Sequence, residues 1–531
     1  MQFQKGDHLT KFLIIGLDGC TWDLIKPWAD DGELPTFKKL MKNGVWGELE
    51  STFPPITCPA WPSMLTGKKP DKLGLYCFTR RDSKGYNPKI YREKLLTGSM
   101  WEILNRFGKR CYIINVPMSE FFKKDDIDGV FVGDPILNTG EIPTIEDLGY
   151  KVHTPSLEKG KEKNYLKGAI EHSKMEFSVV KELLNEDWDL LFYVNCWTDQ
   201  ISHFYWKYMD EKHPEYHYNE EIIPLIKKFY KEIDQFLEEV LNKISTLFIV
   251  SDHGFGSLYY EINLNQWLAL EGFMTKKQKQ FDFKLRLVKE KIMEWFKKVG
   301  SKPLLNPLAK KMKAFLIPEY DKRVFENTPI IDFIDWSKTR AYSIYYGGIN
   351  INLKGRDPAG IVRPEEYESL RQEIIERALK IKDPDGRKVV EKVHRVEELY
   401  KNPSPNSFPD IILRFNNFEY FNKTARSLLL NDILFIKNLH SGSHKMNGIF
   451  LAYGPDIKNG VKIEGTRIYD ITPTILHIFG LPLTKEMDGK VLKEIFKEDS
   501  EYAIKPIIFH EDDEKGKIKK KIRLLKKLGK I

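Results

Sequence analysis

Acidic and imidazole side chains follow three apolar segments of the chain, where they could bind metal ions. Asp18 comes directly after the run KFLIIGL, and Asp252-His253 comes directly after TLFIVS. Asp199 and His203 follow DLLFYVN and stand four residues apart, so on a helix they share one face. Carboxylate oxygens and imidazole nitrogens together suit Zn²⁺ or Mn²⁺.

A fourth segment, HSGSHKMNGIF, carries His444 in a loop with glycine and serine, ahead of another apolar run. Each segment is weak evidence alone, because Asp-Gly after a strand is more often a turn and an Asp/His pair is more often surface decoration. Asp-His after a strand is stronger evidence, because burying two polar groups needs a reason. Together the four segments predict a metal site.

Thr57, in the segment STFPPITCPAWPSMLTG, is the candidate nucleophile. Pro59 and Pro62 bracket the expected first turn of a helix, where proline is tolerated. A hydroxyl at a helix start lies near free backbone N–H groups and the positive end of the helix dipole, which favours an alkoxide and holds a phosphoryl oxygen. Taken alone, Thr57 is better explained as a helix N-cap.

Alternating strands and helices must position these residues. Apolar runs predict strands at 11–17, 110–115, 189–195, 246–251, 348–353 and 448–453, with helices at 34–43 and 470–480. This order indicates an α/β fold with a doubly wound, mainly parallel central sheet. Ligands bind at the carboxyl edge of such sheets, which is where the acidic and imidazole residues are expected.

Three parts of the chain are predicted. Residues 1–270 and 331–500 form the catalytic core, 271–330 an inserted helical cap, and 501–531 a basic C-terminal tail helix. The lysine-rich cap helices either pack on the core with a solvated lysine face or offer a basic amphipathic surface to a membrane or an anionic substrate. The tail is expected to dock on the body, with weak contact to an anionic membrane as the alternative. The oligomeric state has no signal in the sequence.

Composition and charge exclude several classes of protein. The chain has 531 residues, 41% of them hydrophobic and 30% charged, which is typical of a globular protein. The net charge is +8, but residues 515–531 hold nine Lys or Arg and no acid, so removing these nine charges leaves −1 for the body. A near-neutral body argues against nucleic-acid binding.

The expected location is the cytoplasm. The five cysteines form no C-x-x-C pair and are interpreted as reduced thiols. We expect neither a signal peptide at the polar start of the chain nor a bilayer-spanning segment, because no apolar run is long enough.

The order Asp, Thr, Asp-x-x-x-His, Asp-His, His resembles that of the alkaline phosphatase superfamily, specifically its type I phosphodiesterase/nucleotide pyrophosphatase branch. The resemblance covers residues 11–75, 189–203, 246–256 and 441–493, and extends to INLKGRDPAGIV and YDITPTILHIFGLPLTKEMDGK. It implies two divalent metal ions, Zn²⁺ by preference and Mn²⁺ as the alternative. One ion would be held by Asp18, Asp252 and His253 and contact the Thr57 oxygen, and the other by Asp199, His203 and His444.

The resemblance also implies a metal-dependent phosphodiesterase that acts on a small phosphoester. Thr57 would attack phosphorus in line, and water would then hydrolyse the phosphothreonine intermediate. Nucleotide pyrophosphatases carry an asparagine downstream of the nucleophile, whereas the corresponding YCFTRR has none. Arg80 or Arg81 either replaces that contact or belongs to a solvated basic turn, so a nucleotide substrate is not implied.

Other functions are compatible with the same fold. Sulfatases use C/S-x-P-x-R, but here Thr57 and Trp61 occupy the first and last positions, which disfavours sulfatase chemistry. A phosphomonoesterase or phosphomutase of the same superfamily and a non-catalytic phosphate-ester-binding protein stay open. Diester preference is an analogy with the branch. Trp61 is expected to be core or pocket wall, and His440 to lie outside the ligand set.

Overall fold

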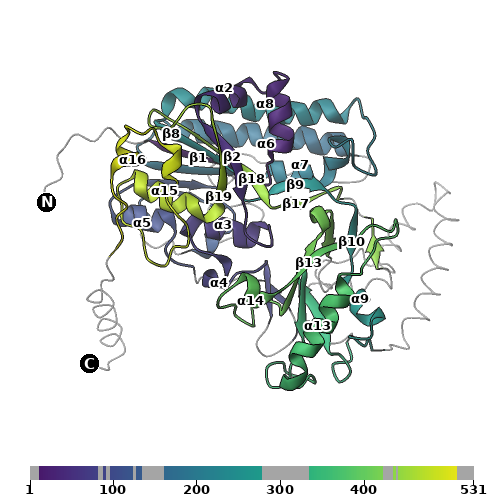
Figure 1. Ribbon diagram of the computed structural model, residues 1–531. Coiled ribbons are helices and arrows are strands. Elements are labelled where there is room, and N and C mark those ends of the chain that lie inside the picture. Colours follow the sequence, from purple (N-terminus) through teal and green to yellow (C-terminus); the bar gives the residue numbers. More distant parts are fainter. Residues whose placement is uncertain are drawn as a thin grey trace, which may run out of the picture.

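The structure is a computed structural model (Figure 1) that describes residues 11–81, 86, 88–90, 96–122, 127–133, 161–277, 334–422, 434–437 and 440–510. Most of the expected cap and tail, residues 278–330 and 511–531, lies outside the described residues.

An eight-stranded sheet with the order β19-β2-β18-β8-β1-β7-β5-β6 forms the centre of the core. Neighbouring strands are parallel except β18, which runs antiparallel to both β2 and β8. The predicted doubly wound, mainly parallel sheet is therefore confirmed. The strands are β1 (Phe12–Leu17), β2 (Val45–Glu50), β5 (Cys111–Ile114), β6 (Gly129–Val132), β7 (Leu190–Asn195), β8 (Thr246–Val250), β18 (Asn447–Tyr453) and β19 (Val461–Arg467).

Helices cover both faces of this sheet (Figure 1). The side chains of β1 alternate between two hydrophobic clusters, with Leu13 and Ile15 in one and Phe12 and Ile14 in the other. Because both faces are covered, the strand is apolar at every position, as its sequence predicts. The first cluster includes α1 (Trp22–Asp30), α2 (Pro35–Asn43), α6 (Glu162–Leu183) and α8 (Ile222–Val240), and the second α3 (Thr57–Thr66), α5 (Met100–Arg106) and α15 (Ile471–Ile478).

A smaller lobe leaves the core after β9 (Gly254–Ser257) and returns at β17 (Gly442–Lys445). We call its described residues 260–277, 334–422 and 434–436 the inserted lobe; it lies at the lower right of Figure 1. A four-stranded sheet has the order β11-β12-β14-β13, and a three-stranded sheet the order β15-β10-β16. Its elements are β10 (Tyr260–Ile262), α9 (Leu264–Leu270), β11 (Ala341–Tyr345), β12 (Gly348–Ile351), α13 (Tyr367–Ala378), β13 (Val390–Arg395), α14 (Val396–Leu399), β14 (Ile411–Phe415), β15 (Tyr420–Asn422) and β16 (Phe435–Ile436).

This lobe has its own hydrophobic core, which also takes in Ile56 and Tyr76 from the segment that carries Thr57. The sequence analysis placed residues 331–500 together in the catalytic core, and the strand predicted at 348–353 is β12 of the lobe. The division has no signal in the sequence because the lobe strands are two to six residues long and no change of composition marks them. Further short elements are α4 (Pro70–Leu73), β3 (Thr79–Arg81), β4 (Pro88–Ile90), α7 (Trp197–Tyr205) and α16 (Glu501–Ile504).

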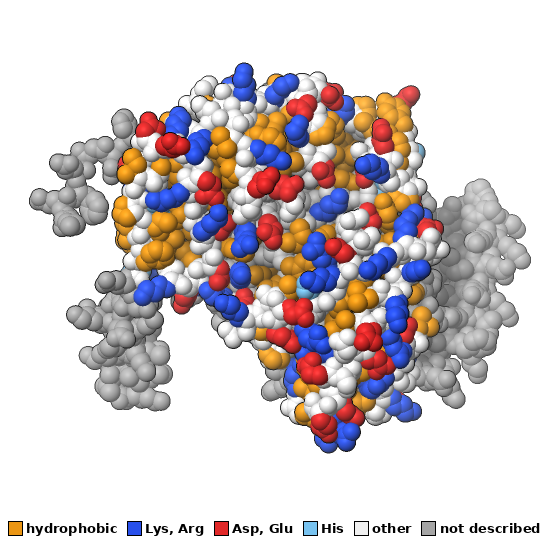
Figure 2. All heavy atoms as spheres, in the orientation of Figure 1, with side chains coloured by type: hydrophobic (Ala, Val, Ile, Leu, Met, Phe, Trp, Pro, Cys, Tyr) orange, Lys and Arg blue, Asp and Glu red, His pale blue; other side chains and the backbone are white. Residues whose placement is uncertain are grey.

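The surface and the thiols agree with the composition. On the face drawn in Figure 2, basic and acidic side chains are interspersed, and no field of one sign gathers over the core. All five cysteines are among the described residues, and none of them forms a disulfide. Within the part of the chain that is described, no helix combines the length and the apolar character needed to cross a bilayer.

Candidate metal centre

Three adjacent parallel strands bring their carboxyl ends to one edge of the sheet. Asp18 directly follows β1, and Asp252-His253 closely follows β8. Asp199 lies in the first turn of α7, which begins after β7. Because β8, β1 and β7 are neighbours in the sheet, these residues meet at the edge where such folds bind ligands.

His444 reaches the same place by another route. It lies on β17, which pairs antiparallel with β9 and sets His444 opposite Phe255. Since β9 begins directly after His253, this short ribbon places His444 above the end of β8. The sequence analysis expected a loop here, because four residues that begin with glycine show no strand pattern.

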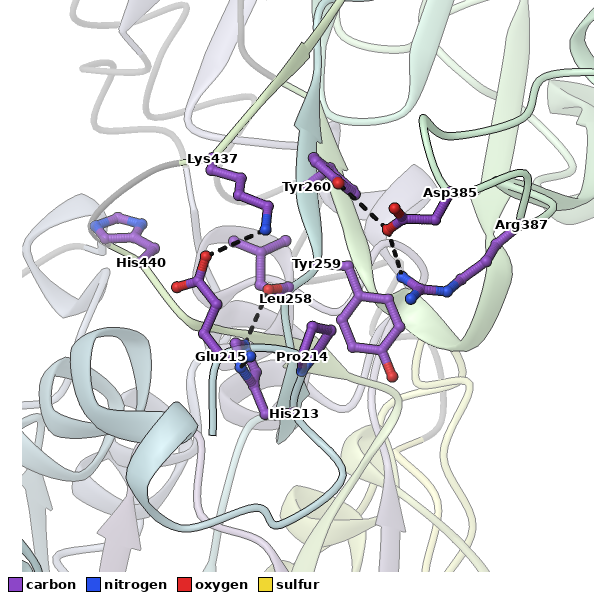
Figure 3. A pocket seen from close by; sticks show the side chains of 10 residues that line it. All are labelled: His213, Pro214, Glu215, Leu258, Tyr259, Tyr260, Asp385, Arg387, Lys437 and His440. Carbon is purple, nitrogen blue, oxygen red and sulfur yellow. Dashed lines mark hydrogen bonds and ion pairs between the residues drawn. The ribbon is translucent and has the colours of Figure 1, made fainter. Parts of the chain in front are cut away.

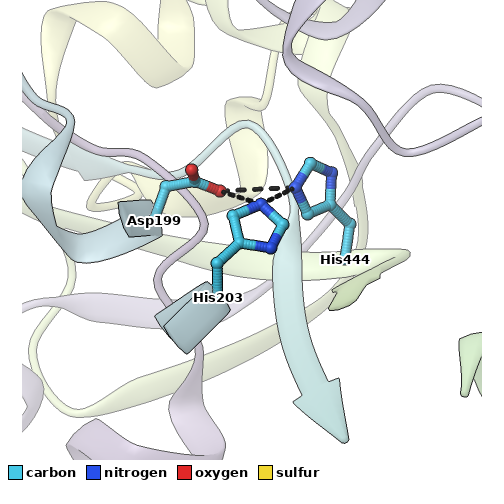
Figure 4. A group of neighbouring side chains, drawn as sticks. All are labelled: Asp199, His203 and His444. Carbon is cyan, nitrogen blue, oxygen red and sulfur yellow. Dashed lines mark hydrogen bonds and ion pairs between the residues drawn. The ribbon is translucent and has the colours of Figure 1, made fainter. Parts of the chain in front are cut away.

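The structure gathers the six expected ligand residues into two groups of three. In each group the candidate ligand atoms lie within 4.8 Å of one another. The imidazole rings of His253 and His444 stack with their centroids 3.7 Å apart, so the groups are adjacent. We call Asp18, Asp252 and His253 the first triad, and Asp199, His203 and His444 the second triad, which Figure 4 shows.

Backbone carbonyls determine which nitrogen of each imidazole carries the proton. The Nδ1 atoms of His203, His444 and His253 each lie within hydrogen-bond distance of a carbonyl oxygen, which can only accept. Each Nδ1 therefore donates, and each Nε2 keeps its lone pair for a metal ion. The acceptors are, in the same order, the carbonyl oxygens of Gly442 (3.2 Å), Pro55 (2.9 Å) and Gly254 (3.1 Å).

In the second triad these lone pairs point at one another (Figure 4). The Nε2 atoms of His203 and His444 are 3.0 Å apart. They lie 3.5 Å and 3.3 Å, respectively, from Oδ1 of Asp199. In the first triad His253 Nε2 is 3.3 Å from Asp252 Oδ2 and 3.6 Å from Asp18 Oδ1. Bare nitrogens and carboxylate oxygens that converge in this way repel one another unless a cation lies between them.

Each carboxylate leaves one buried oxygen without a hydrogen-bond partner: Asp18 Oδ1, Asp199 Oδ1 and Asp252 Oδ2. The other oxygen accepts a hydrogen bond in each case, for Asp199 from Gln200 Nε2 at 3.4 Å. Trp61 Nε1 donates to Asp18 Oδ2 at 3.0 Å, and the Gly19 amide donates to Asp252 Oδ1 at 3.2 Å. Buried oxygens without partners call for an explanation, and a bound cation supplies one. The residues present therefore fit a metal ion in each triad.

The electrostatics of the metal-free site agree with this assignment. Burial, together with the neighbouring carboxylate of Asp252, raises the pKa of Asp18 well above its usual value. Burial also raises the pKa of Asp252 to about 7. Burial lowers the pKa of His203 to about 4 and that of His253 well below its usual value. The imidazoles of His203 and His253 are therefore neutral near pH 7, and a divalent cation would relieve the unfavourable ionisation of Asp18 and Asp252.

Thr57 lies beside the first triad. It is the first residue of α3, and Ile56 is the N-cap, so the explanation of Thr57 as the capping residue is wrong. Its Oγ1 lies 3.5 Å from His253 Nε2, and the residue is half-buried. The amides of the first helical turn have no acceptor within the helix, so they can bind an anion beside the Thr57 hydroxyl.

A buried polar network supports α7. The Asn195 side chain accepts from the Trp197 amide at 3.0 Å, and its Nδ2 donates to Ser173 Oγ at 3.0 Å and to Glu176 at 3.4 Å. Glu176 also accepts from the Tyr193 hydroxyl at 2.7 Å. The sequence analysis missed this network and the bond from Trp61. The one available signal was an asparagine that ends an otherwise apolar strand.

Two further residues have roles that the sequence did not settle. The Arg81 guanidinium is 3% exposed, pairs with Asp357 of the inserted lobe and donates to the Tyr342 hydroxyl at 3.2 Å. Arg81 is therefore neither part of a solvated turn nor a phosphate contact. The His440 ring lies 5.0 Å from the His203 ring and so flanks the second triad without belonging to it.

Comparison with known sequences identifies the family of the chain. Residues 12–428 match the family described as type I phosphodiesterase / nucleotide pyrophosphatase. The match ends before His444, so the place of His444 in the second triad comes from the geometry. None of the curated proteins compared with the chain gives a significant match.

Comparison with solved structures shows that the fold of the chain is similar to known folds. Phosphonoacetate hydrolase from Sinorhizobium meliloti 1021, solved with phosphonoformate, aligns with a TM-score of 0.54 and 14% identity over 87% of this chain and 94% of that chain. Human ectonucleotide pyrophosphatase / phosphodiesterase 5 aligns with a TM-score of 0.48 and 16% identity over 91% of this chain and 97% of that chain. At such identity the first of these supports the fold alone.

Proposed function

The chain belongs to the type I phosphodiesterase / nucleotide pyrophosphatase family and is thus a phosphoric ester hydrolase, and on that premise we propose that it is a two-metal phosphodiesterase with Thr57 as nucleophile. The observation that carries the proposal is the convergence of bare imidazole nitrogens and unpartnered carboxylate oxygens in two adjacent triads. The Thr57 hydroxyl lies directly beside the first triad.

We assign one divalent ion to each triad. Neutral imidazole together with carboxylate favours Zn²⁺, with Mn²⁺ as the alternative. When bound, such ions lower the pKa of a hydroxyl and stabilise the charge that develops on phosphoryl oxygens.

The side chains of the site then have separate roles in the reaction. Trp61 holds the Asp18 carboxylate in place, and the start of α3 offers amides to a phosphoryl oxygen. Thr57 Oγ gives up its proton and forms a bond to phosphorus, while the bond to one ester oxygen breaks on the opposite side and that oxygen takes up a proton from water. This gives a phosphothreonyl intermediate that still carries the second ester arm. Water then attacks phosphorus, and Thr57 Oγ leaves with a proton.

One structural observation favours a diester over a monoester. Arg80 or Arg81 was predicted as a contact to the phosphoryl group, and a monoester would bring an additional negative charge to that contact. Because Arg81 is buried in an ion pair with Asp357, it is committed elsewhere. Two divalent ions, three carboxylates and a Thr57 alkoxide sum to zero charge, and a singly charged diester suits such a site better.

The test combines metal removal with an ester screen. The protein is stripped with a chelator, reloaded with Zn²⁺ or Mn²⁺, and assayed on bis-p-nitrophenyl phosphate and p-nitrophenyl phosphate. We expect either metal to restore activity, with the diester preferred. Thr57→Ala should bind metal normally yet lose about 1,000-fold or more in kcat.

Three outcomes would contradict the proposal. A protein that binds two metal ions but hydrolyses neither ester would be a binding protein and not an enzyme. A preference for the monoester would make it a phosphomonoesterase. Full activity of Thr57→Ala would remove Thr57 from the mechanism.

A further inference from the structure

A small cavity of about 20 Å³ lies between the core and the inserted lobe (Figure 3). Core residues Glu215 and Tyr259 line one part of it, and Asp385 and Arg387 of the lobe line another. Lys437, from the segment that returns to the core, points toward Glu215. The cavity takes no part in holding the metal ligands.

The cavity lies on the side from which a leaving group would depart, an argument that rests on the proposed function. The Thr57 hydroxyl contacts His253 of the first triad. In an in-line displacement the leaving group departs on the side opposite the nucleophile. If phosphorus binds between the two proposed ions, that side is the side of the second triad. His440, which lines the cavity, lies 5.0 Å ring to ring from His203 of that triad.

The charges that line the cavity are balanced. Lys437 Nζ lies 3.4 Å from Glu215 Oε1, and Arg387 Nη1 lies 3.2 Å from Asp385 Oδ2. The Tyr260 hydroxyl donates to the same Asp385 oxygen at 3.3 Å. An anion would have to displace Glu215 or Asp385 from its partner, and a cation would meet Lys437 or Arg387. Neither charged class of leaving group is favoured.

The aromatic rings are poorly placed to stack on a nucleobase. The Arg387 guanidinium lies 4.9 Å from the centroid of the Tyr259 ring, and Lys437 Nζ lies 5.5 Å from that of Tyr260. One face of each ring is therefore covered. The volume of about 20 Å³ accommodates one or two groups the size of a water molecule, not a base.

We propose that this cavity binds hydroxyl groups of a small, neutral polyhydroxyl alcohol, of the glycerol or sugar-alcohol class, that is the leaving group of the diester. A hydroxyl both donates and accepts hydrogen bonds. It can bridge Lys437 to Glu215, or Arg387 to Asp385, without breaking either pair. This property separates a polyhydroxyl group from every charged alternative.

Two alanine variants test whether the cavity binds the leaving group. Lys437→Ala and Glu215→Ala change exposed side chains, and Lys380→Ala is an exposed lysine of the lobe that serves as a control. The probes are bis(glycerol) phosphate and bis-p-nitrophenyl phosphate. We expect both variants to lower kcat/KM for the glycerol diester about tenfold, the worth of roughly one hydrogen bond. Lys380→Ala should hydrolyse both diesters within about twofold of the unchanged protein.

A gain in kcat/KM for the glycerol diester in either variant would show that the ion pair hinders the glycerol arm, and would overturn the inference. No effect of either variant, or hydrolysis of the nitrophenyl diester without the glycerol diester, would remove the cavity from substrate binding and leave the proposed function standing. Hydrolysis of neither diester would overturn the proposed function, and the inference with it.

Discussion

At the residue scale, metal binding depends on three imidazole nitrogens that carry no proton. The carbonyl oxygens of Pro55, Gly254 and Gly442 accept from Nδ1 and leave Nε2 bare. A ligand whose tautomer and orientation are set in advance loses less entropy when the metal binds. In the metal-free site, burial makes the ionisation of Asp18 and Asp252 unfavourable.

We expect the affinity of the metal-free protein for Zn²⁺ to fall below pH 7. Because burial raises the pKa of Asp252 to about 7, a proton must leave this carboxyl before it can bind a cation at lower pH. Asp18, whose pKa burial also raises, must lose its proton as well, so binding should weaken about tenfold or more per pH unit below pH 7. The pKa of His203 is lowered to about 4, so this group adds nothing between pH 5 and 7. Chelator competition across this range measures the slope, and a flat profile from pH 5 to 7 would refute it.

The hydrogen bond from the Trp61 indole to Asp18 allows a test of whether a neighbouring residue supports a metal ligand. Trp61→Phe removes the N–H that holds Asp18, so we expect the affinity of the first triad for metal to fall about tenfold or more. Trp101→Phe is a matched control, since that indole nitrogen is also buried but makes no hydrogen bond. Isothermal titration of both variants measures the change, and equal affinities would deny Trp61 this role.

At the element scale, the site is built by strand ends and one helix start. The Asn195 side chain at the end of β7 accepts from the first amide of α7, the helix that carries Asp199 and His203. The position of the second triad thus depends on the polar network that includes Asn195. The first triad depends on β1 and β8 instead.

We therefore expect Asn195→Ala to weaken one metal site selectively. The loss of the hydrogen bond from the Trp197 amide costs about 1 kcal/mol of folding free energy and loosens the first turn of α7. Zn²⁺ titration should show one site weakened about tenfold and the other unchanged. Asn350→Ala, at a buried asparagine of the inserted lobe, controls for the loss of a buried amide. Equal weakening of both sites would show a general loss of stability instead.

The elements also differ in how well the sequence predicted them. Strands β1, β7 and β8 were predicted because full burial on both faces makes every position apolar. The six expected ligands follow such strands or stand in the family order. In contrast, β17 and the lobe strands are short, and the partner of Glu176 comes from a distant part of the chain. Contacts made only by tertiary folding leave no local pattern.

At the scale of the whole molecule, the inserted lobe is tied to the segment that carries the nucleophile. Arg81 on β3 pairs with Asp357 of the lobe, and Asp357 also accepts from Arg356 at 3.0 Å. The cavity proposed to bind the leaving group lies between the same two parts. The lobe therefore contributes to substrate choice without contributing a metal ligand among the described residues.

We expect Arg81→Met to destabilise the fold by about 3 kcal/mol, the low end for breaking a buried pair, because Arg356 still neutralises Asp357. Denaturant unfolding measures this loss, and KM for bis-p-nitrophenyl phosphate should stay unchanged where the variant is folded. Arg110→Met, which breaks an exposed pair with Asp128, should change stability little. A raised KM without any loss of stability would return Arg81 to the substrate site.

The central claim is a covalent intermediate on Thr57, and the stereochemical course of hydrolysis tests it most directly. A diester made chiral at phosphorus by one sulfur and an isotopically labelled water report the configuration of the product. Two successive in-line displacements, by Thr57 and then by water, predict retention of configuration. Inversion would show that water attacks the diester directly, and would contradict the account.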